Sequence, residues 1–234
     1  MKTAVMCAPY GASYLGLLDN LVDWLTALQP PGASFKEAVL EPAKFLAPII
    51  WREARAVTDS GIKFRRWFQR LGSRIIRGGL PVQWTTPAGL LVSTGDRPVT
   101  ATRINTEISG SWYVASILDA DPGAELSANA SRRKLAANLI HSLDGSLVHV
   151  MASTAGAKKV PLITNHDCFA TIPSRASWLH GELLNQTQRM YRPDLLAALV
   201  AEIAERGKVA VPRGLPIVGD LDPAAIGTNP YLYC

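Results

Sequence analysis

The stretch LITNHDCFATIP, residues 162–173, constrains the fold more than any other part of this chain. Apolar, β-forming residues flank a polar centre, Asn165-His166-Asp167, and Asn and Asp tolerate the backbone conformations of tight turns. The pattern predicts a buried β-hairpin with His166 and Asp167 at its tip. An Asp there suits a Mg²⁺ site, because hard carboxylate oxygens can share the ion with a phosphate. It equally suits a turn in which the Asp side chain bonds the backbone.

The composition permits a sizeable core. The chain has 234 residues, 48% of them hydrophobic, which predicts one large domain or two small ones. No run of about 18 uncharged apolar residues occurs, so we expect no membrane span. The N-terminus does not match a signal peptide. The three cysteines lack metal-binding spacing and suit a reducing cytosol.

The first third of the chain has helical spacing. A first helix is expected from about Ala12, stopped at Pro30, and a second over residues 36–58, interrupted by Pro42 and Pro48. A basic helix follows and ends at Gly78-Gly79.

The pattern then changes, which predicts an α+β fold. Short β-like runs follow, separated by turns at residues 87–89 and 95–96. Residues 109 to about 129 are expected to form a further ribbon with its turn at residues 121–123. A helix is expected from about His141 to Gly156. A long helical pattern, broken at Pro193, covers residues 174–207.

The basic helix is a candidate nucleic-acid contact. Between Lys63 and Gly79 six basic residues occur and no acidic one, in a chain of net charge +5. Five of them fall at three- and four-residue spacing on one helix face: Lys63, Arg66, Arg70, Arg74 and Arg77. Such a face fits a helix laid along a phosphate backbone or an ordinary solvated surface.

Two further patterns could bind a nucleotide. Lys2 and Tyr10-Gly11 are just over two helical turns apart, so Lys2 and Tyr10 would project within about 80° of each other. A frayed terminus with a core tyrosine is the alternative. In NLIHSLDGS, residues 138–146, Ser142 or Asp144 could cap a helix start. His141 would lie just outside, as a sugar or phosphate ligand or as a structural histidine.

In their order along the chain, six motifs resemble the C-terminal part of the single-subunit, bacteriophage-type DNA-directed RNA polymerases, a family that includes mitochondrial enzymes. They are Lys2…Tyr10-Gly11, VQWTTPAG (82–89), TRIN (102–105), NLIHSLDGS, LITNHDCFATIP and the final PYLYC. The resemblance covers essentially the whole chain. It implies part of a right-hand polymerase fold, with fingers helices over residues 1–80, a ribbon region over 81–137 and a palm segment over 138–234.

The resemblance implies a role for each matching residue. Asp167 matches the second palm aspartate, which ligates two catalytic Mg²⁺ ions, and His166 is its neighbour at the nucleotide site. Lys2 matches the fingers lysine that holds the nucleotide phosphates, and Tyr10-Gly11 the pair beside the nucleotide. His141 matches a histidine that approaches the ribose.

The ribbon region matches less completely. Arg103 and Asn105 match the start of a ribbon that reads promoter bases, and both are residue types that groove recognition favours. Beyond Asn105 the sequence is largely apolar or acidic, which departs from the family's polar base-reading pattern. The last residues resemble the family's C-terminal foot, so Cys234 is expected to be the natural terminus.

The implied function is RNA synthesis by two-metal nucleotidyl transfer from NTPs to an RNA 3′ end. The family's first palm aspartate precedes the fingers helix, whereas Met1 stands directly before Lys2 here. We therefore expect a second subunit to supply that aspartate, the rest of the palm, the thumb and the N-terminal region. DNA template, nascent RNA and NTPs are the other expected partners. A virus-encoded protein in the cytoplasm of an infected bacterium is expected rather than a mitochondrial one.

Two other interpretations compete with this one. Family A DNA polymerases share Lys-x7-Tyr-Gly and a His-Asp turn, but they follow that Asp with Glu, where this chain has Cys168. A non-catalytic nucleic-acid-binding remnant, held together by the basic helix and the ribbon, is the other.

Overall fold

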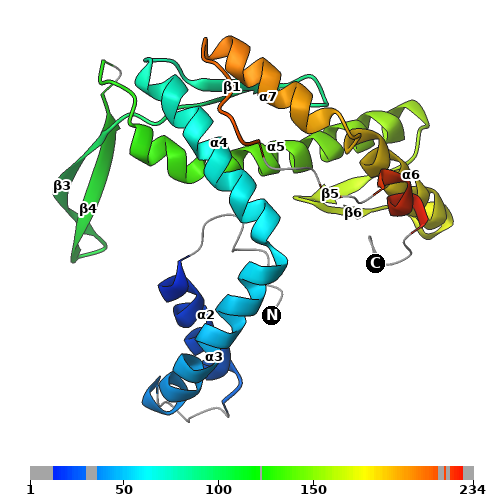
Figure 1. The fold of residues 1–234 in the computed structure, drawn as a ribbon. Helices are drawn as coiled ribbons and strands as arrows, with labels where there is room; N and C mark the ends of the chain where they lie inside the picture. The colour runs from blue at the N-terminus through cyan, green and yellow to red at the C-terminus, as the bar shows by residue number, and fades with distance from the viewer. Residues whose placement is uncertain (1–12, 30–35, 122, 216–218, 220–221, 229–234) are drawn as a thin grey trace. The chain divides into compact units, whose positions relative to one another are not determined.

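The computed structural model describes residues 13–29, 36–121, 123–215, 219 and 222–228. They form helices and short antiparallel hairpins, which confirms the α+β prediction (Figure 1). The chain divides into two compact units, the first made of residues 1–69 with 214–216 and the second of residues 70–213 with 217–234. No helix in the described part is both long and apolar enough to cross a membrane.

The first unit contains two packed helices, α2 (Tyr14–Ala27) and α3 (Lys36–Val57). Ser13 caps α2, since its hydroxyl accepts a hydrogen bond from the Gly16 amide at 3.0 Å. Leu17 of α2 and Ala54 of α3 are buried between the helices, with Leu21, Ile50 and Trp51 packed around them.

Helix α3 is continuous, so the predicted interruption is wrong. Pro42 and Pro48 both lie inside it. A proline in a helix interior removes one hydrogen bond and clashes with the preceding turn. Packing of the helix against α2 offsets that cost: Ala54 is only 2% exposed at this contact.

Helix α4 (Asp59–Arg77) confirms the predicted basic helix, which ends just before Gly78-Gly79. Four apolar side chains on one face are buried: Trp67, Phe68, Leu71 and Ile75. The five basic residues predicted to share one helix face are all exposed. The boundary between the two units falls inside this helix, between Gln69 and Arg70.

The second unit begins with a small hairpin, β1 (Val82–Thr85) and β2 (Leu91–Thr94). The turn predicted at residues 87–89 is confirmed, because the Gly89 amide donates to the Thr86 carbonyl at 2.8 Å and Gly89 has φ +84°. Glu202 of α7 (Leu195–Arg206) holds the hairpin through Oε1, which accepts from the amide and hydroxyl of Thr85 at 3.0 and 2.6 Å.

A ten-residue ribbon follows, formed by β3 (Val99–Ile108) and β4 (Ser111–Ala120). Its turn is Ser109-Gly110, both with positive φ (54° and 79°), as a two-residue hairpin turn of primed type requires. The turn expected at residues 121–123 exists, since the Gly123 amide donates to Asp121 Oδ1 at 2.8 Å, but it follows the ribbon and leads into the next helix.

Helix α5 (Ala128–Ala157) starts well before His141, so the predicted helix start is wrong. Ser127 caps it through a hydrogen bond from the Ala130 amide. The Ser131 hydroxyl accepts from the Asp96 amide at 2.8 Å, and Lys134 Nζ lies 2.7 Å from Asp96 Oδ1. These contacts fix the base of the ribbon to the first turns of α5 (Figure 1).

The C-terminal part confirms the helical pattern with a break before residue 195. A short 3-10 turn, η1 (Pro173–Arg175), leads into α6 (Ala176–Met190), and α7 follows. A second 3-10 segment, η2 (Pro223–Thr228), packs on α6.

Candidate active site

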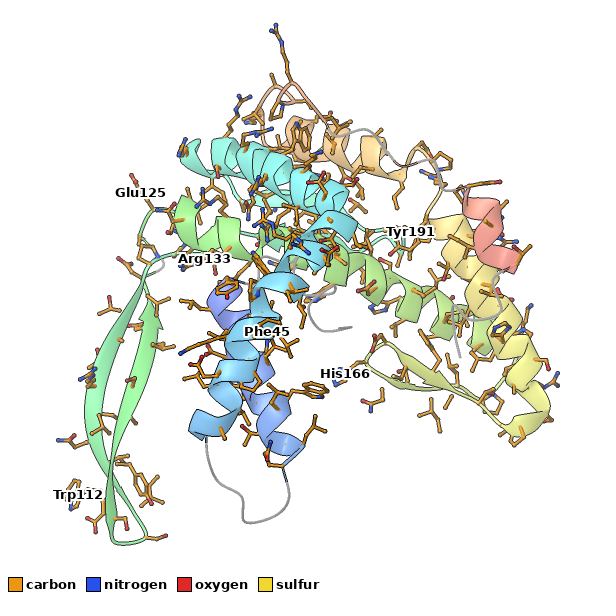
Figure 2. The ribbon with its side chains drawn as sticks, turned by 60° about the horizontal axis from the view of Figure 1, so that its bottom comes forward. Phe45, Trp112, Glu125, Arg133, His166 and Tyr191 are labelled. Atoms are coloured by element: carbon orange, nitrogen blue, oxygen red, sulfur yellow. The ribbon has the colours of Figure 1, made fainter. Side chains whose placement is uncertain are left out.

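The stretch LITNHDCFATIP forms the predicted hairpin. Strand β5 (Ile163–Asn165) pairs with β6 (Cys168–Ala170), with Asn165 opposite Cys168 and His166-Asp167 as the turn. His166 has φ +54°, an uncommon left-handed conformation for a non-glycine residue. Figure 2 shows His166 at the tip of the hairpin. Such conformations persist where surrounding structure holds them, often at functional sites.

The hairpin is anchored through its base. Phe169 and Leu162 pack against a buried cluster from α5 and α6: Leu147, Met151, Leu179, Leu183 and Met190. The Thr171 hydroxyl donates to the Pro161 carbonyl at 2.6 Å and closes the base. The apolar side of β6 therefore fixes the hairpin on the helices, while the turn projects from them.

The hairpin is not buried as predicted. His166 and Asp167 are exposed, and Ile163 is 70% exposed. Each strand has only three residues, and Phe169 is the strand residue that reaches the core cluster. The other face of this two-stranded sheet has no covering element among the described residues, so its β-forming side chains meet solvent.

Helix α5 carries NLIHSLDGS in its interior rather than at a cap. Asp144 lies three residues after His141, which places both on one side of the helix. The Ser142 hydroxyl does not cap a terminus: it donates to the Leu139 carbonyl at 2.7 Å and accepts from the Trp84 indole N–H at 2.9 Å. Trp84 is fully buried.

The bond from Trp84 to Ser142 joins two of the sequence motifs. VQWTTPAG provides strand β1 and NLIHSLDGS the middle of α5, 58 residues further on. A buried indole N–H needs an acceptor, so this pair fixes the rotation of α5 at the turn that presents His141 and Asp144. Nothing in the separate motifs predicted this contact.

The charge of Asp167 acts on the Asp144 carboxyl. The pKa of Asp144 is raised above its ordinary value: partial burial is the largest cause, His141 acts in the opposite direction, and the charge of Asp167 raises it further. Both carboxylates stay accessible to solvent. Hard oxygen ligands in such an arrangement suit Mg²⁺, although the described residues contain no group of three or more His, Cys, Asp or Glu side chains placed for a metal.

A pocket of about 460 Å³ opens beside the hairpin, between β6 and α6. Asp167, Thr171 and His180 contribute its polar groups, and Phe169, Leu179 and Leu183 its apolar wall. Its volume lies in the range of small-ligand sites. His180 was not singled out from the sequence, because only the fold brings α6 beside the turn.

A second cavity, of about 390 Å³, lies among the β1–β2 turn, α6 and α7. Its charged lining includes Arg189, Arg192 and Glu202, of which Arg192 pairs with Asp194 and Glu202 with Arg206. We place the candidate site at the first pocket, because that pocket contains Asp167.

The predicted nucleic-acid contacts are accessible. Lys63 pairs with Asp59 at 2.6 Å, whereas Arg66, Arg70 and Arg74 have no ion pair with any described residue. Arg103 and Asn105 are two residues apart on β3, so they share one face of the ribbon, and both are exposed.

The remaining predicted site residues cannot be placed. Lys2, Tyr10 and Gly11, and the final residues up to Cys234, lie outside the described residues.

Comparison with known proteins matches this chain to RNA polymerases. The family model described as DNA-dependent RNA polymerase matches residues 1–214. The DNA-directed RNA polymerase of Pseudomonas phage phiKMV is 25% identical over 236 residues, covering all of this chain and 28% of that protein. T7 RNA polymerase of Escherichia phage T7 is 24% identical, covering 88% of this chain and 25% of its own length.

Organellar enzymes match as well. DNA-directed RNA polymerase 2, chloroplastic/mitochondrial, of Arabidopsis thaliana is 24% identical over the whole chain and 22% of its own length. The chain thus spans about a quarter of the length of these relatives.

Proposed function

The chain belongs to the DNA-dependent RNA polymerase family of phage type, and from that premise we propose that it supplies fingers and palm elements to an enzyme that extends RNA on a DNA template. One observation carries the proposal: Asp167 stands on a two-residue turn anchored by Phe169, within electrostatic reach of Asp144. A virus-encoded protein acting in the cytoplasm of an infected bacterium fits the phage relatives.

Asp167 is the proposed metal ligand of the reaction. Bound Mg²⁺ would supply positive charge against the phosphates and the attacking oxygen, which is the chemistry that two-metal sites provide. The chain's own contribution is positional, since the hairpin that carries Asp167 is anchored to the helices at its base. In the reaction, the RNA 3′-hydroxyl oxygen attacks the α-phosphorus of an NTP, and pyrophosphate leaves.

Other residues bind and orient the nucleotide in this proposal. Lys2 neutralises phosphate charge, and Tyr10-Gly11 lies beside the incoming base and sugar. His141, one turn before Asp144 on α5, contacts the ribose, and His166 supports the turn. We add Asp144 to the residues of this site that the sequence predicted, because the charge of Asp167 raises the pKa of its carboxyl.

The carboxylate that completes the metal site is proposed to come from a second polymerase subunit. A two-metal site needs at least two carboxylates that bridge the ions. Asp119 lies in a strand, but that strand is the exposed ribbon β4 rather than the hairpin that carries Asp167. The second subunit would also contribute the thumb and the N-terminal region.

The decisive experiment is co-purification of the chain with the product of the neighbouring reading frame, followed by primer extension. The complex is expected to incorporate ribonucleotides, and Asp167→Asn is expected to lower the rate by about 10³-fold, the scale of losing a metal ligand. Asp23→Asn, a matched change of an exposed Asp on α2, should leave the rate unchanged.

Three results would count against parts of the proposal. RNA synthesis by this chain alone would exclude an essential second subunit. Full activity of the Asp167→Asn complex would favour the non-catalytic nucleic-acid-binding alternative. Preference for deoxyribonucleotides would favour a family A DNA polymerase.

The basic face of α4 is proposed to follow the template backbone. Each phosphate contact adds about 0.9 to the slope of log K against log salt concentration. Replacing Arg66, Arg70 and Arg74 by Gln should therefore lower that slope by about 3. The matched control replaces three exposed basic residues of α3, Lys44, Arg52 and Arg55, by Gln. Equal slopes for the two triple variants would mean that the basic face of α4 does not contact the template phosphates.

The ribbon face that carries Arg103 and Asn105 is proposed as a second nucleic-acid contact. Replacing either residue by Ala should weaken binding to a preferred sequence while leaving the affinity for random DNA nearly unchanged. An equal loss on all sequences would mean that the residues contact the backbone only.

A further inference from the structure

A row of polar side chains on helix α5 bonds to the β1–β2 hairpin. Asn138 Nδ2 donates to Thr94 Oγ1 at 2.9 Å. The Ser142 hydroxyl accepts from the Trp84 indole N–H, also at 2.9 Å. Two further contacts reach Asp96, just after β2, at 2.8 and 2.7 Å. Spacings of three and four residues place the whole row on one side of the helix; its members are Ser131, Lys134, Asn138 and Ser142.

This row fixes how α5 is rotated about its own axis. Burial of apolar surface is non-directional and sets the rotation of a helix only loosely. Hydrogen bonds are directional and weaken steeply when the angle at the hydrogen falls below about 120°. The contact between Trp84 and Ser142 allows little adjustment, because the one proton of the Ser142 hydroxyl is donated to the Leu139 carbonyl at 2.7 Å. Trp84 is 0% exposed, so water does not replace Ser142 as the acceptor.

His141 and Asp144 turn with this part of the helix. His141 directly precedes Ser142 and Asp144 follows it by two residues, so all three lie within about one helical turn. Side-chain tips lie about 5–6 Å from a helix axis, so a rotation of about 10° moves them by about 1 Å. Donor–acceptor distances in hydrogen bonds span only about 2.7–3.2 Å. A small rotation of α5 at Ser142 is therefore enough to break a substrate contact made by His141.

We propose that Trp84 and Ser142 are positioning residues for nucleotide binding, which hold His141 at the nucleotide ribose through the rotation of α5. The inference rests on the proposed function, in which His141 contacts the ribose. Trp84 is buried and acts through α5, so it does not touch the substrate itself. The motif VQWTTPAG thereby gains a role in the reaction, at a distance of 58 residues along the chain from Ser142.

The expected effect is on nucleotide binding rather than on chemistry. His141 is carried by α5, whereas the proposed metal ligand Asp167 is carried by the β5–β6 hairpin. Loss of the bond between Trp84 and Ser142 should therefore raise the KM for NTPs and keep kcat within about threefold. The expected rise in KM is about tenfold, the scale of one lost hydrogen bond.

Steady-state primer extension by the complex of this chain with its proposed second subunit provides the test. Trp84→Phe keeps a ring in the core and removes the N–H, and Ser142→Ala removes the acceptor. Each change should raise KM about tenfold. Ser142→Thr retains the hydroxyl and should restore the wild-type KM. In a His141→Ala background, Trp84→Phe should not raise KM further, because the two residues act as one unit.

Glu202→Ala is the matched control. Trp84 and Thr85 are neighbours on β1 and point to opposite faces, so Glu202 holds the hairpin from the side away from α5. This change loosens the same hairpin and should leave KM unchanged.

Three results would overturn the inference alone. They are an unchanged KM in both Trp84→Phe and Ser142→Ala, an equal effect of Trp84→Phe with and without His141, and an equal rise of KM in Glu202→Ala. Absence of RNA synthesis by the wild-type complex would instead overturn the proposed function, and the inference with it.

Discussion

Replacing Glu202 by Ala should destabilise the second unit by about 2–3 kcal/mol. Glu202 Oε1 accepts three hydrogen bonds, from the Thr85 amide at 3.0 Å, the Thr85 hydroxyl at 2.6 Å and Arg206 Nε at 2.8 Å. Bonds to charged groups contribute roughly 1.5–3 kcal/mol each when buried. The Glu202 side chain is 27% exposed and a single oxygen accepts from all three donors. The total stabilisation is therefore far below the sum for three separate buried bonds.

The effect depends on pH with a definite sign. Burial alone would raise the pKa of Glu202, but the hydrogen bonds from Thr85 and the charge of Arg206 outweigh it, so the folded-state pKa lies below the ordinary 4.5. A carboxylate with a lowered folded-state pKa contributes its stability above the unfolded-state pKa and loses it as the pH falls through the folded-state value. The difference between wild type and variant should therefore be complete at pH 7 and shrink below about pH 4.5.

Thermal unfolding followed by circular dichroism, at pH 7 and in acid, measures both effects. For a chain of this size a loss of about 2–3 kcal/mol lowers the Tm by roughly 4–12 °C. Glu205→Ala, an exposed glutamate on the same helix, is the matched control and should change little. Equal Tm values for the two variants at pH 7, or a difference that persists undiminished in acid, would refute the reasoning.

Three further predictions concern helix packing and the site. Gly72→Ala should cost about 1–3 kcal/mol in denaturant unfolding, because an added Cβ would collide with the Leu135 side chain, whereas Gly181→Ala, with open space beside it, should be neutral or slightly stabilising. Trp84→Phe should cost about 1–2 kcal/mol by leaving Ser142 without the indole donor; an unchanged unfolding midpoint would contradict this. Asp144→Asn should lower the rate of the reconstituted complex about 10–100-fold without weakening template binding, and an unchanged rate would remove Asp144 from the site.

Local patterns predicted most elements of the fold. The basic helix, the β1–β2 turn, the break before α7 and the hairpin with His166-Asp167 at its tip all follow from spacing and turn residues. Each of these signals is local, because a helix face or a tight turn is decided within a few residues.

The errors arose where packing or a competing signal decided the structure. Helix α5 begins at Ala128, after its cap Ser127, but its first turns carry Ser, Arg and Lys, so no apolar stripe appears before Leu135. The Asp121–Gly123 turn is a stronger signal than Ser109-Gly110, and yet the second forms the ribbon tip. The hairpin was expected to be buried because strand composition does not reveal which faces another element covers.

The site was predictable in part. Asp167 and His166 occupy a tight turn as expected, but Asp144 and His180 approach Asp167 only because α5 and α6 pack beside the hairpin. Contacts between residues far apart in sequence, such as Trp84 with Ser142, depend on tertiary arrangement and leave no periodic trace.

Helix α5 also gives the second unit a mechanical connection. Ser131 of α5 accepts a hydrogen bond from the Asp96 amide, and Met151 belongs to the cluster against which Phe169 packs. These two positions are 20 residues apart, which corresponds to about 30 Å of helix. A tilt of about 5° at the ribbon end would move the far end by roughly 2.5 Å over that length. A displacement of this size exceeds the roughly 1 Å at which misplacement in an active site costs about 10²-fold in rate, so α5 links the ribbon mechanically to the turn of the proposed metal ligand Asp167.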